Sequence, residues 1–122
     1  MLKEAILKIS ALDHRDNTIL ATLQINKDAE IFIGHFAGQP VLPGACMLQM
    51  VKEVLQSALS ISFRLQKASY IKFISLIDPG VHDCLQLRLT YQSAKDNIVE
   101  ITADMIAQNA ICFKFRGSFI IT

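Results

Sequence analysis

The stretch that decides the fold of this chain is Gly34-His35-Phe36-Ala37-Gly38-Gln39-Pro40-Val41-Leu42-Pro43-Gly44. It holds three glycines and two prolines. Proline fixes φ and removes a backbone donor, and glycine permits unusual backbone conformations. Neither a regular helix nor a central strand suits these residues, so we expect an irregular segment that ends where a helix begins.

The residues after this stretch have the spacing of an apolar helix, roughly Gly44 to Leu59. Counted at about 100° per residue, apolar side chains fill more than half of its circumference. The remaining arc holds Gln49, Lys52, Glu53, Gln56 and Ser57. A surface helix would have a narrower apolar stripe, so we expect this helix to be wrapped by other elements.

The rest of the chain has the two-residue alternation of half-buried strands. Ahead of the helix, Ala5–Leu12 and Ile19–Ile25 predict a hairpin with its turn in Asp13–Asn17. Four strands are expected after the helix, at Arg64–Ile74, Leu85–Gln92, Val99–Met105 and Ile111–Phe119. The sequence therefore predicts an α+β fold with an antiparallel sheet of about five to six strands around one long helix.

Length and composition indicate a globular protein. The 122 residues fit a single domain, which we place at residues 1–122. Hydrophobic residues make up 52% and charged residues 19%. So much apolar material in so small a domain predicts that some of it is buried against another subunit. A net charge of +1 argues against a general nucleic-acid binder, and no apolar run is long enough to span a membrane.

The cysteines and the start of the chain favour the cytoplasm. Cys46, Cys84 and Cys112 have no metal-ligand spacing, and an odd number of cysteines is typical of reduced thiols. Met1–Ile9 contains charged residues and lacks the uninterrupted apolar core of an export signal. His14 and His82 fall in turn-like segments and are expected to face solvent.

Two stretches resemble a known family. Gly34–Gly44 closely resembles the signature GHFxGxPVxPG of the 3-hydroxyacyl-acyl-carrier-protein dehydratases of the FabZ and FabA type. Lys72-Phe73, followed by Asp78-Pro79-Gly80, is similar to that family's "KF…PG" segment. The resemblance implies a hotdog fold, in which a sheet wraps around a central helix. It also implies subunits that pair edge to edge, with active sites at their interface.

The resemblance implies roles for single residues. The motif histidine falls on His35, which would remove a proton from the substrate. The backbone N–H of Gly44 would polarise the thioester carbonyl, as a helix N-terminus is suited to do. Phe36, Gly38 and Pro43 would line the substrate site, with Met47 and Met50 along the acyl chain. Methionines on an apolar arc are also ordinary core residues, and that alternative stays open.

The sequence departs from the family at its second catalytic position. Fourteen residues after the histidine, where the family has Asp or Glu, stands Gln49. An amide cannot deliver a proton as a carboxylic acid does. One turn later, where the family commonly has Gln, stands Glu53. We hypothesise that Glu53 supplies the acid and that Gln49 positions the hydroxyl or the departing water. The alternative is that both simply belong to a solvated helix face.

The resemblance also implies partners and an activity. The substrate would be a 3-hydroxyacyl chain on the phosphopantetheine of acyl carrier protein, dehydrated to the trans-2-enoyl thioester with no further cofactor and no metal. Lys67, Lys72 and Arg116 are candidates for a basic patch that binds this acidic carrier. We expect a homodimer, a trimer of dimers, or a heterodimer with a homologue.

Two other functions fit the same residues. One is a non-catalytic subunit that binds acyl carrier protein and pairs with an active homologue. The other is a hotdog thioesterase. The Gln49 departure suggests a specialised fatty-acid, polyene or polyketide-type pathway rather than housekeeping lipid synthesis.

Overall fold

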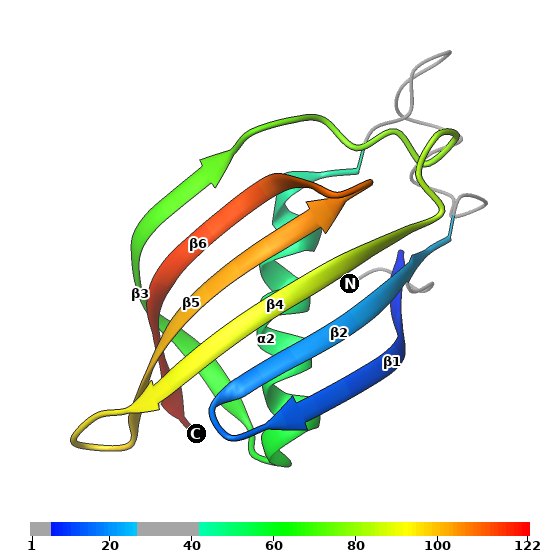
Figure 1. Ribbon diagram of the computed structural model, residues 1–122. Coiled ribbons are helices and arrows are strands. Elements are labelled where there is room, and N and C mark those ends of the chain that lie inside the picture. Colours follow the sequence, from blue (N-terminus) through cyan, green and yellow to red (C-terminus); the bar gives the residue numbers. More distant parts are fainter. Residues whose placement is uncertain (1–5, 27–41) are drawn as a thin grey trace.

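The computed structural model describes residues 6–26 and 42–122 (Figure 1). It contains a helix, α2 (Gly44–Leu59), and an antiparallel sheet in the order β1-β2-β4-β5-β6-β3. The strands are β1 (Leu7–Arg15), β2 (Thr18–Ile25), β3 (Phe63–Phe73), β4 (Cys84–Ser93), β5 (Ile98–Ala107) and β6 (Ala110–Ile121). The predicted α+β hotdog arrangement of one long helix and six strands is confirmed.

The core lies between α2 and one face of the sheet, which we call the inner face. Figure 1 shows the helix behind β4 and β5, crossed by the curved sheet. The helix contributes Val51, Val54 and Leu55, all 0% exposed. Alternate residues of the strands meet them, among them Leu87 and Leu89, also 0% exposed. Complete burial of such a side chain contributes roughly 1.5–3 kcal/mol, so this contact dominates the stability of the fold.

The helix has the predicted bounds, and its C-terminus is tied to the sheet. It ends at Ser60, whose φ of 55° is left-handed and whose N–H donates to the Gln56 carbonyl at 2.8 Å. The Gln56 side chain also accepts a hydrogen bond from the Phe63 N–H at 2.9 Å. The start of β3 is therefore bonded to the last turn of α2. Among the described residues, no helix combines the length and apolar content that crossing a bilayer requires.

The first hairpin turns later than predicted. The expected turn began at Asp13, but β1 continues to Arg15 and β2 begins at Thr18, so only two residues connect them. Asp16 adopts a φ of 52°, as tight hairpin turns require. His14 lies in the strand, where its Nε2 is 2.7 Å from the Tyr91 hydroxyl. This contact with β4 adds to the pairing that keeps the polar residues before the turn in an extended strand.

Two further residues are more buried than their sequence surroundings suggest. Cys112 precedes the buried Phe113, so strand alternation would place it on the opposite, outer face, but it is 1% exposed and its Sγ lies 3.4 Å from the Met105 carbonyl oxygen. The pairing of β5 with β6 shifts register between Met105 and Ile106, close to Cys112. His82 was expected in solvent but is partly buried, and its Nδ1 is buried with no hydrogen-bond partner within the described residues.

The close approach of β6 to β3 gives a stability prediction. A Cβ added at Gly117 would lie 2.2 Å from the Lys67 carbonyl oxygen and 2.7 Å from Phe115 Cζ. Backbone cannot move aside cheaply, so we expect Gly117→Ala to lower the free energy of unfolding by about 1–3 kcal/mol. Chemical denaturation measures this change. Gly80→Ala is the matched control, since its nearest neighbour is a side-chain oxygen of Asp78 at 3.1 Å. Equal stability of Gly117→Ala and wild type would contradict the prediction.

Candidate active site

The predicted site residues fall into two groups. His35, Phe36 and Gly38 lie outside the described residues, so their roles stay predictions. The remaining candidates lie on α2, on the segment just before it, and on strands β3 and β6. Their surroundings show what the start of the helix offers chemically.

The described end of the first motif stretch, Leu42–Gly44, meets the second stretch at the start of α2. The Leu42 N–H donates to the Ile77 carbonyl at 2.8 Å, which joins the end of the glycine- and proline-rich stretch to the segment after β3. The Phe73 ring covers Gly44, since a Cβ there would lie 2.5 Å from Phe73 Cε1. Residues about 30 positions apart in sequence therefore form one wall around the helix N-terminus.

The turn Asp78-Pro79-Gly80, before β4, is held by hydrogen bonds to Asp78. The Asp78 carboxylate accepts a hydrogen bond from the Gly80 N–H at 2.8 Å, and its carbonyl accepts from the N–H groups of Val81 and His82 at 2.9 Å each. Ile77 is 1% exposed and Pro79 is buried. Asp78-Pro79-Gly80 thus holds the chain against the core and leads into β4.

The first turn of α2 is suited to binding negative charge. Its N-cap is Pro43, and no side-chain hydrogen bond caps the helix within the described residues. The first turn also contains no acidic residue. The Cys46 N–H donates to the Pro43 carbonyl at 3.0 Å. Within the described residues, no side chain competes for the N–H groups of Gly44 and Ala45 at the positive end of the helix dipole. This is compatible with the predicted role of the Gly44 N–H, which stays a prediction.

In the middle of α2, the polar site candidates are exposed and the apolar ones are buried. Gln49 and Glu53 are exposed, and as an i, i+4 pair they are neighbours on one side of the helix. No Lys or Arg among the described residues forms an ion pair with Glu53. Met47 and Met50 instead point into the core, at 3% and 5% exposed. Their predicted contact with an acyl chain stays a prediction, and core packing accounts for both in the single chain.

The Cys46 thiol, on the same helix, is unsuited to nucleophilic chemistry. It is partly buried, and desolvation raises its pKa above the ordinary value. A raised pKa leaves less thiolate at neutral pH, and the thiolate is the reactive form. Cys46 instead packs against the hydrophobic core as a small apolar side chain.

The predicted basic residues lie at the β3 edge of the sheet. Lys72 is the register partner of Lys114, and Tyr70 that of Arg116, whose guanidinium carbon lies 5.9 Å from the centre of the Tyr70 ring. Lys67 pairs further along, opposite Ser118. Cross-strand partners share a face of the sheet, so Lys72, Lys114 and Arg116 form one cluster on the outer face.

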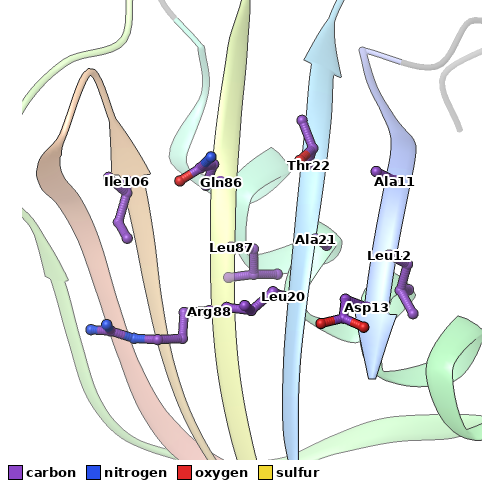
Figure 2. A pocket seen from close by; sticks show the side chains of 10 residues that line it. All are labelled: Ala11, Leu12, Asp13, Leu20, Ala21, Thr22, Gln86, Leu87, Arg88 and Ile106. Atoms are coloured by element: carbon purple, nitrogen blue, oxygen red, sulfur yellow. The ribbon is translucent and has the colours of Figure 1, made fainter. Parts of the chain in front are cut away.

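A groove of about 400 Å³ lies on the face of the sheet away from α2. Figure 2 shows the side chains that line it across β1, β2, β4 and β5. Leu12, Leu20 and Ile106 are its large apolar side chains, next to Thr22, Gln86 and Arg88. Leu20 pairs with Arg88, Thr22 with Gln86, and Gln86 with Ile106, so these side chains point away from the buried Leu87 and from the helix. Leu12 pairs with the buried Ala21 and lines the groove from the rim of β1. The groove is therefore separate from the start of α2.

Comparison with known proteins gives a family match over most of the chain. The model of the ApeI-like family, described as ApeI dehydratase, matches residues 11–114. The 3-hydroxyacyl-[acyl-carrier-protein] dehydratase FabZ of Lactobacillus helveticus is 24% identical over 111 residues, covering 85% of this chain and 74% of the relative. FabZ of Oenococcus oeni is 34% identical over 87 residues, covering 66% of this chain and 61% of the relative.

Solved structures share the fold. The dehydratase heterocomplex ApeI:P from Xenorhabdus doucetiae contains a chain that is 18% identical, with a TM-score of 0.73 and coverage of 93% of this chain and 97% of that one. A hypothetical thioesterase with coenzyme A from Streptococcus pneumoniae is 14% identical, with a TM-score of 0.64 and coverage of 95% and 85%. At these identities the likeness is one of fold.

The contact between Gly44 and Phe73 predicts that Gly44→Ala changes the free energy of unfolding in opposite directions with and without the Phe73 ring. Gly44→Ala should destabilise the wild type, because its Cβ would displace the Phe73 ring, which packs 5.1 Å from the ring of Phe113. In a Phe73→Ala background that obstacle is gone, and alanine should stabilise the helix by up to roughly 1 kcal/mol. Thermal or chemical denaturation of the four proteins measures the cycle. If Gly44→Ala changed stability equally in the wild type and in Phe73→Ala, the contact between Gly44 and the Phe73 ring would be contradicted.

Proposed function

Because this chain belongs to the family of ApeI-like dehydratases, we propose that it removes water from a 3-hydroxyacyl chain carried on acyl carrier protein, giving the trans-2-enoyl thioester. The observation that carries the proposal is the start of α2. There Leu42–Gly44, the described end of the first signature stretch, meets the second stretch, and no side chain among the described residues caps the helix. A thioester carbonyl that gains negative charge during proton removal is the acceptor such a helix end favours.

In the proposed mechanism, the His35 imidazole removes the proton α to the thioester carbonyl. The charge that develops on the carbonyl oxygen is stabilised by the Gly44 N–H. The C–O bond at the β carbon then breaks as the hydroxyl receives a proton from Glu53 and leaves as water. His35 has gained one proton and Glu53 has lost one, so a proton returned through solvent resets both groups.

The exposure of Glu53 supports a site shared between subunits. Glu53 and Gln49 both face solvent in the single chain, at positions that neighbouring helical turns place roughly 5–6 Å apart. Cover by substrate and a second chain would exclude water and strengthen the contacts that such an acid makes with the substrate. We therefore propose that a second subunit completes the site, with Glu53 as the acid and Gln49 holding the hydroxyl or the departing water.

A second candidate is a non-catalytic subunit that binds the acyl carrier and pairs with an active homologue. Gln49 favours it, because general acid–base help is typically worth about 10²–10⁴ in rate and an amide cannot supply the acid. The ApeI:P structure, a dehydratase heterocomplex, makes pairing of unlike chains reasonable for this family. A thioesterase is less well supported, since its comparison rests on the fold.

The setting of the reaction is part of the same proposal. The departure at Gln49 favours a specialised fatty-acid, polyene or polyketide-type pathway. The three free cysteines suit a reducing compartment, and we place the reaction in the cytoplasm. Acyl carrier protein would approach the outer-face cluster of Lys72, Lys114 and Arg116, which complements its acidic surface.

The first experiment is turnover of a 3-hydroxyacyl-carrier-protein thioester, followed by mass spectrometry for loss of water. We expect wild-type turnover and a fall of about 10²–10⁴-fold in kcat for Glu53→Gln, because the acid is lost. His35→Ala should abolish turnover without changing the circular dichroism. Glu100→Gln, an exposed carboxylate on β5, is the matched control and should behave like wild type.

Each other outcome identifies a different arrangement. Unchanged turnover in Glu53→Gln would remove that residue from the mechanism and leave Gln49 with a bound water. Unchanged turnover in His35→Ala would overturn the mechanism as a whole. No wild-type turnover, with the carrier still bound, would favour the non-catalytic subunit.

The carrier-binding cluster gives a separate kinetic prediction. Arg116→Ala should raise KM for the carrier-bound substrate roughly two- to fivefold, as expected for the loss of an exposed charge contact. KM for the same acyl group on free pantetheine should not change, because that substrate has no acidic surface. Lys95→Ala, in the turn between β4 and β5, is the control. An equal effect on both substrates would place Arg116 at the acyl site instead.

A further inference from the structure

The segment between β3 and β4 carries the most exposed large apolar side chains among the described residues. Leu76 is 78% exposed, Val81 60% and Phe73 55%, and no other large hydrophobic side chain that the structure describes reaches these values. Ile74, in the same segment, is 45% exposed. Single exposed apolar residues are ordinary, but several close together mark a surface that binds a ligand or a partner.

Backbone hydrogen bonds hold Leu76 in place from both sides. The Ser75 N–H donates to the Cys112 carbonyl at 3.3 Å. On the other side of Leu76, the Ile77 carbonyl accepts from the Leu42 N–H at 2.8 Å, and the Ile77 side chain is buried. The backbone of Leu76 is thus fixed while its side chain is open to solvent. A group that is already fixed has less conformational freedom to lose when a ligand covers it, which favours binding.

The same bonds place this segment beside the start of α2. Leu42 lies two residues before Gly44, and the Phe73 ring covers Gly44. Figure 1 shows the chain after β3 passing the start of the helix on its way to β4. Phe73, Ile74 and Leu76, which we call the apolar strip, therefore lie next to the N–H group at which the thioester carbonyl is proposed to bind.

Val81 belongs to a different surface. It lines a cavity of about 310 Å³ together with polar side chains, among them His82 and Gln108. That cavity also borders Gln86 and Ile106, which line the groove on the outer face of the sheet. Val81 is therefore an exposed apolar residue of the same segment that lies outside the apolar strip.

The apolar strip suits a hydrocarbon chain. From Phe73 to Ile77 the segment has no charged side chain. Met47 and Met50, which were predicted to contact the acyl chain, are buried in the core of the single chain, whereas the strip is open without any repacking. An acyl chain is joined directly to the thioester carbonyl, so a carbonyl bound at Gly44 brings the chain close to the strip.

We propose that Leu76, with Phe73 and Ile74 beside it, contacts the acyl chain of the substrate and determines which chain lengths the site prefers. The inference rests on the proposed function for its substrate, but the contact requires binding and not the removal of water. A hydrophobic contact of this kind is made equally in the bound substrate and in the transition state, so it lowers KM and leaves kcat unchanged.

The test is a chain-length series in wild type and Leu76→Ser. Acyl carrier protein presents 3-hydroxybutanoyl, 3-hydroxyoctanoyl and 3-hydroxydodecanoyl groups, and kcat and KM are measured for each. Val81→Ser is the matched control, because it makes the same kind of change outside the apolar strip. Leu76→Met keeps an apolar side chain of similar size. The Leu76 side chain is exposed, so both of its variants should fold. Analytical ultracentrifugation compares the oligomeric states.

In wild type and in Val81→Ser, we expect KM to fall about threefold for each methylene group that reaches the strip. In Leu76→Ser, KM for the dodecanoyl substrate should rise roughly four- to tenfold, while its KM for the butanoyl substrate and every kcat stay as in wild type. Leu76→Met should keep the wild-type values. An unchanged KM for the dodecanoyl substrate in Leu76→Ser would overturn the proposal.

Two further results would also overturn it. An equal rise of KM for all three chains in Leu76→Ser would place the side chain against the carrier protein. A change of oligomeric state in Leu76→Ser would place it at a contact between subunits.

A binding series separates this inference from the proposed function. Butanoyl, octanoyl and dodecanoyl carriers have no hydroxyl group to lose, and calorimetry measures their Kd. Suppose wild type turns over no substrate but prefers the dodecanoyl carrier, and Leu76→Ser loses that preference; the inference then stands without the proposed function. If wild type is active and Leu76→Ser keeps the preference, the proposed function stands and the inference fails. A wild type with no chain-length preference would overturn the inference in either case.

Discussion

The contact on which the rest of the structure depends is the burial of α2 against the inner face of the sheet. Val51, Val54 and Leu55 have no exposed surface, and the strands curve around them. This contact fixes the rotation of the helix about its axis. Gln49 and Glu53 consequently point away from the core, and the first turn of the helix lies beside Phe73 and the segment that follows it. The packing of α2 in the core therefore determines which residues of the helix are available to the candidate site.

The elements of the fold could be predicted because their signals are local. The helix has the predicted bounds because Pro43 and Gly44 mark its start and its apolar arc ends with Leu59. The strands follow from two-residue alternation. The hairpin turn was misplaced because Asp13, His14 and Arg15 have the polarity of a turn, while pairing with β2 keeps them in a strand. The burial of Cys112 and His82 depends on non-local packing, which a single sequence does not contain.

The candidate site could be predicted in part. The motif indicated where the helix starts and which backbone N–H groups it offers. That Leu42 bonds to Ile77, and that Phe73 covers Gly44, followed only from the arrangement of distant segments. The positions of Lys72 and Arg116 near each other likewise depend on the register of β3 against β6. Sequence could name these residues, but only the pairing of the strands brings them together.

The hydrogen bond from the Phe63 N–H to the Gln56 side chain has a mechanical consequence. Gln56 lies one turn beyond Glu53 on the same polar arc, and only Ser60, Ile61 and Ser62 separate the helix from β3. The last turn of α2 and the start of β3 are therefore coupled, since neither can move far without breaking this bond. Phe63 is only 2% exposed, so its N–H would be left without a partner in a dry environment if the Gln56 amide were removed. A polar residue of the helix thus fixes where the edge strand of the sheet begins.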